Sequence, residues 1–313
     1  MTTHRRSAEP ILIAVTVVIL LVLGYRLFGS RLSQPASTAK LAQQTNTKIV
    51  VSVNQWQSIV SRVAGSSATV SAILTNSGVD AHSYEPDAAD QSRLASADIV
   101  VVNGAGYDEW ASKAAAGGKA QIINAAQLAH VPSGGNPHVW FSSRTRLAVA
   151  NAVCDELERR DPSQTRQLRH NLAGWKKDEQ ALESRIRQVR DALSRASASV
   201  RSFAATESVA DYLAVDLGLK DHTPTGYANA SRNESEPAPA DIKAFTTLLS
   251  SKKVGLLIVN TQEEDKTTQQ LIGAAQKAGI PLVRLTETRP QKYATTIAWM
   301  NALVDQFTKA LRL

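Results

Sequence analysis

Short apolar runs alternate with amphipathic stretches along most of the chain, and these runs have the length of buried strands. Strands of this kind, separated by helices, are typical of parallel sheets whose faces are covered by helices. The predicted strands span residues 49–53, 69–74, 98–102, 121–123, 200–204, 254–259 and 281–285. The predicted helices span residues 56–63, 87–95, 207–217, 240–249, 267–278 and 293–311. The hydrophobic pattern therefore predicts an α/β fold.

The middle of the chain departs from this alternation. After Asp161 and Pro162, a favourable helix start, apolar residues recur at spacings of three, four and seven, which mark one face of a single helix. These residues are Leu168, Leu172, Trp175, Leu182, Ile186, Val189 and Leu193. A helix from about Ser163 to Arg195 would be roughly 50 Å long. A coiled coil has similar spacing, but only one such segment is present, which favours a long helix laid across a globular body.

We therefore predict two α/β lobes with parallel-rich sheets, joined by one rigid helix and separated by a cleft. The N-terminal lobe is expected at residues 48–162, the linker helix at 163–197 and the C-terminal lobe at 198–313. No internal sequence repeat relates the two lobes.

The amino-terminal end has the pattern of an export signal. Arg5 and Arg6 precede an apolar run of thirteen residues, 11–23, and extension to Phe28 reaches about eighteen residues, near the minimum that crosses a bilayer. No small-residue cleavage site follows, and no cysteine stands where a lipid could be attached. We predict an uncleaved signal anchor at residues 1–29 with its basic end inside, followed by a flexible polar tether at 30–47. Export with cleavage is the alternative.

Composition adds little to this picture. Hydrophobic residues make up 43% of the chain and charged residues 20%, ordinary values for a globular body with a core. The net charge is +7, and residues 159–201 hold eleven Lys or Arg against five Asp or Glu. Nucleic-acid binding would explain this excess, but no aromatic or glycine-rich motif is interleaved, so a solvated helix face is favoured. The single cysteine, Cys154, is interpreted as a buried apolar residue on a helix.

Two of the six histidines lie where ligands of α/β sheets collect. His82 stands in the segment Gly78–Pro86, past the carboxyl end of the second predicted strand, and His138 stands in Gly134–Trp140, after the fourth. A lone loop histidine is usually a surface residue, whereas two at equivalent strand ends indicate a shared site. The remaining histidines are expected at the surface or in the amino-terminal tail. They are His4, His130, His170 and His222.

Both histidine segments resemble a known family. Asp80-Ala81-His82-Ser83-Tyr84-Glu85-Pro86 and Asn136-Pro137-His138-Val139-Trp140 are similar to the two histidine motifs of the zinc/manganese ABC-transporter solute-binding proteins. Val102-Asn103-Gly104-Ala105-Gly106-Tyr107-Asp108 resembles the turn after the family's third strand, and Val53-Asn54-Gln55-Trp56 its opening. The resemblance extends from about Lys48 to the end. It implies a two-lobed receptor with a long backbone helix.

The resemblance also implies two ligands from the second lobe. Glu207 stands at the family's third ligand position, where manganese-type members have a carboxylate, and Glu287 stands at the fourth, where Asp is common. Alternative explanations exist for both. A carboxylate at the start of a helix is favoured by the helix dipole without any ligand, and Glu287 could pair with Arg289. The implied metal ligands are therefore His82, His138, Glu207 and Glu287, two from each lobe.

The chemistry of this set suits a divalent cation. Two neutral imidazoles and two carboxylates carry a charge of minus two, which balances the ion in a buried site. Nitrogen and oxygen donors suit Zn²⁺, Mn²⁺ or Fe²⁺ rather than copper(I). Carboxylates that bind through both oxygens would favour Mn²⁺, while intrinsic affinity favours Zn²⁺. Two departures from the family pattern are the missing His/Asp-rich loop of many zinc receptors and the missing lipid-anchored cysteine.

The sequence therefore predicts the extracytoplasmic solute-binding component of an ABC importer, a monomer that carries one divalent metal ion to a membrane permease and catalyses no reaction. The first alternative is a metal-dependent hydrolase on the same cluster, with Glu85 as general base and an open coordination position. The second alternative is a cell-surface adhesion protein. The third is a receptor for a siderophore or cofactor, which would have a wide cleft lined by aromatic residues.

Overall fold

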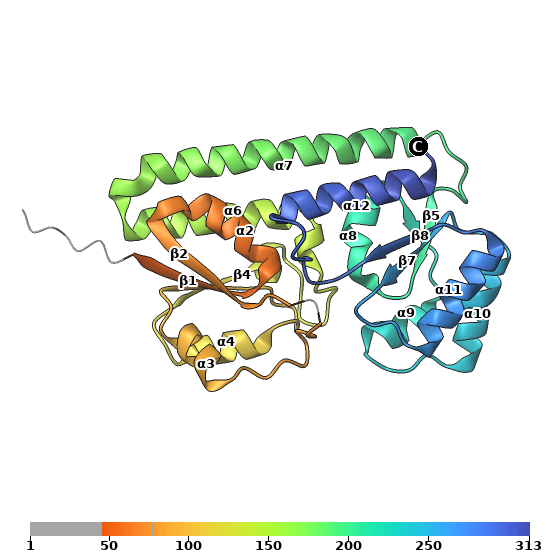
Figure 1. The fold of residues 1–313 in the computed structure, drawn as a ribbon, viewed down its shortest axis with the longest axis horizontal. Coiled ribbons are helices and arrows are strands. Elements are labelled where there is room, and N and C mark those ends of the chain that lie inside the picture. Colours follow the sequence, from red (N-terminus) through yellow and green to blue (C-terminus); the bar gives the residue numbers. More distant parts are fainter. Residues whose placement is uncertain (1–45, 77) are drawn as a thin grey trace, which may run out of the picture. The chain divides into compact units, whose positions relative to one another are not determined.

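The computed structural model of the chain describes residues 46–76 and 78–313 (Figure 1). The predicted signal anchor at residues 1–29 lies outside the described residues, as do His4 and all but the last two residues of the predicted tether at 30–47. Within the described part, no helix is both long enough and apolar enough to cross a membrane.

The first sheet has four parallel strands in the order β2-β1-β3-β4. They are β1 (Thr47–Val53), β2 (Ala68–Leu74), β3 (Ile99–Val102) and β4 (Gln121–Asn124), each predicted to within two residues at either end. In Figure 1, α2 (Asn54–Ala64) and α6 (Ser143–Arg160) lie on one face of this sheet, with α3 (Ala88–Ala95) and α4 (Glu109–Ala116) on the other. The short helix α5 (Ala125–Leu128) follows β4 directly. This sheet forms the N-terminal lobe.

The second sheet repeats this strand order as β6-β5-β7-β8, again all parallel. Its strands are β5 (Ser202–Ala205), β6 (Lys220–Asp221), β7 (Leu256–Asn260) and β8 (Leu282–Leu285). Its helices are α8 (Asp211–Asp216), α9 (Thr225–Arg232), α10 (Pro239–Ser250), α11 (Lys266–Ala278) and α12 (Thr296–Leu311). This sheet forms the C-terminal lobe, and the predicted α/β fold with two parallel sheets is confirmed.

Successive residues of β7 pack into different hydrophobic clusters. Leu257 and Val259 pack with Phe245 of α10 and Leu271 of α11, whereas Leu256 and Ile258 belong to the large cluster that includes α8 and α12. Side chains of a strand alternate between the two faces of its sheet. Helices therefore cover both faces of the second sheet, as a buried parallel sheet requires.

The long helix α7 (Thr165–Leu193) follows a single 3₁₀ turn at Pro162–Gln164 and ends two residues before the predicted Arg195. It contacts α2, α6 and α12 and thereby runs along both lobes (Figure 1). All seven apolar residues that predicted its inner face are buried. The helix lies across the globular body, as expected, rather than in a coiled coil.

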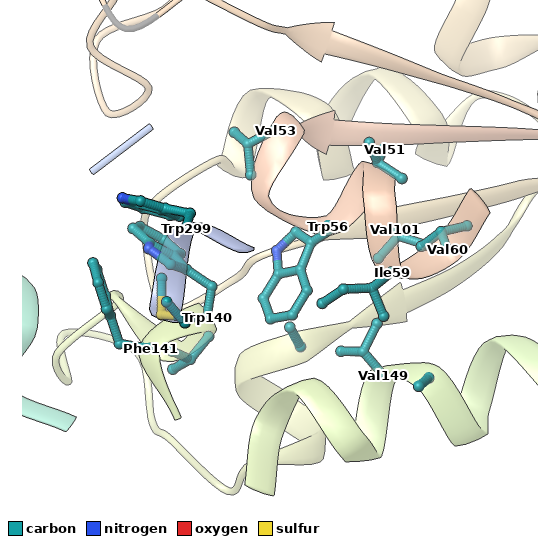
Figure 2. Packing of buried hydrophobic residues seen from close by; sticks show 14 of the residues in the cluster. Val51, Val53, Trp56, Ile59, Val60, Val101, Trp140, Phe141, Val149 and Trp299 are labelled. Atoms are coloured by element: carbon teal, nitrogen blue, oxygen red, sulfur yellow. The ribbon is translucent and has the colours of Figure 1, made fainter. Parts of the chain in front are cut away.

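Aromatic side chains fill the N-terminal lobe beneath the loop that carries His138. Figure 2 shows Trp56 of α2, Trp140 and Phe141 of the 3₁₀ turn Val139–Phe141, and Trp299 of α12 packed together. Trp140 and Phe141 lie 5.8 Å apart and Phe141 and Trp299 5.3 Å apart between ring centroids, favourable aromatic spacings. The backbone that follows His138 is therefore held in place by buried aromatic packing.

Cys154 is fully buried on α6, as predicted. Burial, together with a hydrogen bond to Glu158, raises the pKa of its thiol to about 12. The thiol is therefore protonated and unreactive at neutral pH.

Candidate metal centre

The four predicted ligands converge at the carboxyl ends of the strands of both sheets. His82 lies in the loop after β2, and His138 follows β4 and α5. Glu207 comes two residues after β5 and Glu287 two residues after β8. Ligand atoms of His82, His138 and Glu287 lie within 4.8 Å of one another. Glu207 Oε1 lies 3.6 Å from His138 Nε2.

These side chains lie at different depths. The side chains of His138 and Glu287 are 3% and 4% exposed, whereas those of Glu207 and His82 are 18% and 23% exposed. The first pair forms the floor of the site and the second pair its accessible side. The other histidines of the described part, His130, His170 and His222, are exposed as expected.

Asn136 fixes the position of the His138 ring and the tautomer of its neutral form. Its side-chain oxygen accepts hydrogen bonds from the His138 main-chain N–H at 3.0 Å and from Nδ1 at 2.8 Å. Its side-chain nitrogen donates to the carbonyl oxygen of Ser208 at 2.7 Å, which settles the orientation of the amide. Because Nδ1 donates its proton, Nε2 of the neutral ring carries a free lone pair.

The Nε2 atom of His138 is buried and has no hydrogen-bond partner. It faces Glu207 Oε1 at 3.6 Å and Glu287 Oε2 at 3.8 Å. Buried polar atoms without a partner are rare and call for an explanation. A cation between one ring nitrogen and two carboxylate oxygens would satisfy all three atoms, and metal-binding histidines commonly donate their second N–H to an oxygen, as this one does to Asn136.

Glu287 is held by residues of both lobes. The Tyr107 hydroxyl donates to its Oε2 at 3.0 Å, and the Gln55 side chain donates to its main-chain oxygen at 3.0 Å. Arg289 does not pair with Glu287: its guanidinium donates to the main-chain oxygens of Asn54 and Tyr293. The explanation of Glu287 as the ion-pair partner of Arg289 is therefore wrong.

Tyr107 reaches Glu287 because of the turn after β3. Both carboxylate oxygens of Asp108 accept main-chain N–H groups, from Asn103 at 2.6 Å and from Gly104 at 2.8 Å. Gly104 has φ +82°, and a Cβ there would meet the Asn124 side chain at 2.2 Å, so this position requires glycine. The turn aims the Tyr107 ring between the two histidines, 4.6 Å from the His82 ring and 6.1 Å from that of His138.

Glu207 precedes the 3₁₀ turn Ser208–Ala210, and its side chain makes no capping hydrogen bond there. Its Oε2 instead accepts a hydrogen bond from Asn260 Nδ2 at 2.6 Å. The carboxylate therefore points into the site, and a role in helix capping does not explain its position.

The amino-acid sequence matches the family model described as zinc-uptake complex component A, periplasmic, over residues 49–310. The chain belongs to this family. The match covers both lobes and the long helix, and the resemblance predicted from the two histidine motifs is confirmed.

Curated relatives of this chain include metal-binding proteins of several bacteria. It is 25% identical over 288 residues to the iron-binding protein YfeA of Yersinia pestis, covering 88% of each chain. It is 22% identical over 251 residues to the manganese ABC transporter substrate-binding lipoprotein PsaA of Streptococcus mitis, covering 75% of this chain and 78% of PsaA.

Solved structures share the fold. The periplasmic zinc-binding protein TroA from Treponema pallidum superposes with a TM-score of 0.70 at 18% identity, covering 85% of this chain and 99% of TroA. FpvC from Pseudomonas aeruginosa, solved with Mn²⁺, gives a TM-score of 0.66 at 23% identity, covering 85% of this chain and 97% of FpvC.

The two carboxylates of this family member differ in protonation. Burial, with the charge of nearby Glu287, raises the pKa of Glu207 to about 9. Burial acts in the same direction on Glu287, but the His138 ring in its protonated form and the Tyr107 hydroxyl outweigh it and hold the pKa of Glu287 below its ordinary value. Without a cation the pair therefore carries about one negative charge, because two buried carboxylates this close repel each other.

The structure adds residues that the sequence did not predict. Asn260, at the end of β7, contacts both Glu207 and Glu287, and the exposed Glu263 forms a second acidic group with the same two carboxylates. Both follow the predicted strand 254–259, whose carboxyl end lies between those of β5 and β8. Their position directly after that strand end was the feature of the sequence that could have identified them.

A cavity of about 840 Å³ lies beside the site, with polar and charged side chains along most of its wall. Besides the two histidines, Tyr227 is the aromatic residue among those that line it. The lining of this cavity therefore differs from the wide aromatic cleft expected of a siderophore receptor. Glu85, the general base of the hydrolase alternative, is exposed and belongs to neither group of potential metal ligands.

Proposed function

We propose that this chain is the extracytoplasmic receptor of an ABC importer, which captures one divalent transition-metal ion between its lobes and delivers it to a membrane permease. The observation that carries this proposal is the buried, unpartnered Nε2 of His138, which faces two carboxylate oxygens. Its family and its relatives, named for iron, manganese and zinc, support it.

The proposed ligands are His82, His138, Glu207 and Glu287. With both histidines neutral and both glutamates ionised, the set has a charge of minus two and neutralises a divalent ion. His82 and Glu207 lie on the accessible side, so the ion would reach the buried pair past them. This role requires no catalytic step.

We further propose that residues 1–29 form a signal anchor and residues 30–47 a tether, which keep the receptor next to its permease as a monomer. Loss of residues 1–29 should then release the protein from the membrane fraction of cells that express it. Retention of this truncated chain in membranes would contradict the anchor without affecting the metal site.

The test of the metal site is competition binding of Zn²⁺ and Mn²⁺ to the full chain, purified in mild detergent. The variants His138→Ala and Glu207→Gln should each weaken both metals at least about tenfold, because each removes a ligand. His170→Ala on α7 and Glu109→Gln on α4 change exposed residues of the same types and are the matched controls. Tight binding by His138→Ala would overturn the proposed site.

A further inference from the structure

Asn260 occupies a buried position between the two proposed carboxylate ligands. It is 2% exposed and ends β7, the central neighbour of β5 and β8. Its side-chain oxygen accepts the main-chain N–H of Gln262 at 3.0 Å, and its own main-chain N–H donates to Thr206 Oγ1 at 3.3 Å. These bonds fix the amide so that the Nδ2 group, with its two hydrogens, must face the carboxylates.

The Nδ2 group donates one hydrogen bond to each glutamate. It lies 2.6 Å from Glu207 Oε2 and 2.8 Å from Glu287 Oε1. The other oxygen of each carboxylate, Glu207 Oε1 and Glu287 Oε2, is the one that faces His138 Nε2. One amide therefore holds one oxygen of each carboxylate, and the other two are directed at the ring nitrogen, where Glu287 Oε2 also accepts the Tyr107 hydroxyl at 3.0 Å.

We infer that Asn260 is a positioning residue that determines metal specificity by restricting Glu207 and Glu287 to one coordinating oxygen each. This inference rests on the proposed metal-binding function. Nδ2 carries no lone pair for a metal, and an oxygen that accepts its hydrogen bond is a poorer second donor. The ion then receives two imidazole nitrogens and two oxygens, a low coordination number.

Such a site discriminates between ions by geometry. Four nitrogen and oxygen donors suit tetrahedral Zn²⁺, whereas Mn²⁺ is typically octahedral and oxygen-rich. Carboxylates free to bind through both oxygens, which the sequence allowed for, would supply the extra donors that Mn²⁺ prefers. The amide of Asn260 thus adds geometric selection against Mn²⁺ to the intrinsic preference for Zn²⁺.

The deciding variant is Asn260→Leu, which keeps a similar volume and removes both hydrogen bonds. In the full chain, competition titration should show the ratio of Zn²⁺ to Mn²⁺ affinity falling about tenfold, because each carboxylate is released from the amide at one oxygen, which can then coordinate Mn²⁺. The control is Asn171→Leu on α7, which also removes a buried amide, here bonded to the carbonyl oxygen of Val63 at 3.1 Å. An affinity ratio that is the same in both variants would overturn the inference.

X-ray absorption at the zinc edge tests the wild-type protein directly, even if Asn260→Leu does not fold. Four nitrogen or oxygen ligands at about 2.0–2.2 Å are expected, and five or six would overturn the inference. Five or six ligands at the zinc of the wild-type protein, together with tight metal binding, would leave the proposed function intact. If the wild-type protein binds neither ion and His138→Ala changes nothing, the proposed function and this inference both fail.

Discussion

At the residue scale, the charge of Glu207 links metal binding to pH. Its pKa of about 9 lies far above the ordinary value of about 4.3, so the folded metal-free protein holds a proton there that the unfolded chain releases. Between about pH 5 and pH 9 the folded state therefore binds more protons than the unfolded state, and its stability falls as pH rises.

We expect chelator-treated wild type to lose unfolding free energy from pH 5.5 to pH 8.5, by at most about 1.4 kcal/mol per pH unit from this group. Glu207→Gln cannot ionise and should flatten this dependence. Denaturant unfolding at several pH values, with Glu109→Gln as the exposed control, measures it. Equal slopes for wild type and Glu207→Gln would show that Glu207 is already ionised in the folded protein.

Asn136 gives a second prediction at this scale. Its side-chain oxygen holds the Nδ1 proton of His138 and thereby leaves the lone pair on Nε2. Residues that orient a metal ligand in this way typically contribute 10–100-fold to metal affinity. Asn136→Ala should therefore weaken Zn²⁺ binding by about that factor in calorimetric titration, whereas Asn229→Ala, at an exposed site on α9, should not. Unchanged affinity would mean that the ring keeps its tautomer without Asn136.

The sequence predicted the two histidines from local motifs and the two glutamates from their positions in the family that the chain resembles. His82 and His138 lie in short segments rich in Asp, Asn, Pro and Trp, and the two glutamates follow strand ends. Tyr107 was noted only as part of a turn, and its contact with Glu287 was not predicted because the two residues are 180 positions apart. Asn260 was missed because nothing beside it in the chain distinguishes it from an ordinary strand-end asparagine. Contacts between residues that are far apart in the chain leave no local pattern in the sequence.

At the scale of elements, the hydrophobic pattern predicted the helices and strands that have a continuous buried face. The long helix α7 was predicted because one apolar stripe runs along its length, and seven strands were predicted from their apolar runs. The eighth strand, β6 (Lys220–Asp221), has two exposed charged residues and no apolar signal. Helix α4 is largely alanine, so it has no stripe of large apolar residues. Its burial comes from packing against α3.

A buried ion pair joins α7 to α6. Arg146 and Glu179 are 1% and 2% exposed, and the guanidinium donates two hydrogen bonds to the carboxylate, at 2.5 and 3.1 Å. A third N–H of Arg146 donates to the carbonyl oxygen of Trp140 at 2.8 Å, close to His138 in the chain. Removing one partner of such a pair leaves the other charge buried without compensation.

Glu179→Gln should therefore destabilise the protein by about 3–5 kcal/mol in denaturant unfolding. The control is Glu156→Gln, which loses the partner of the largely exposed Arg159, a contact of the kind typically worth about 0–1 kcal/mol. Because Glu156 also accepts from Arg160, somewhat more can be lost. Similar losses in the two variants would show that burial does not set the strength of the Arg146–Glu179 pair.

At the scale of the whole molecule, the proposed ligands come from two sheets that the chain joins at several points. Helix α7 runs along both lobes, and residues after β8 return to the N-terminal lobe, where Thr296 donates to the main-chain oxygen of Gln55 at 2.5 Å and Asn54 donates to that of Arg289 at 3.0 Å. These links restrict hinge motion. Metal release should then depend on small shifts of the loops that carry Glu207 and His82, the more exposed ligands.

A metal ion bound by both lobes should stabilise the whole molecule as one unit. At a free Zn²⁺ concentration of 100 times Kd, unfolding should cost about 2.7 kcal/mol more than without metal, through binding to the folded state alone. Calorimetry should show a single transition moving to higher temperature as Zn²⁺ rises. Glu207→Gln leaves three ligands, those of the compact His82, His138 and Glu287 group, and should shift far less at equal Zn²⁺.

The unfolding temperature of His170→Ala should rise with Zn²⁺ as that of wild type does, since this exposed histidine lies on α7 away from the site. If zinc moved only part of the heat absorption and left a second, unshifted transition, the ion would be held by one lobe. Either the two histidines or the two glutamates would then have no share in binding. A single transition whose shift becomes smaller both in Glu207→Gln and in His138→Ala requires a ligand from each lobe, and so requires the ion to lie between the lobes.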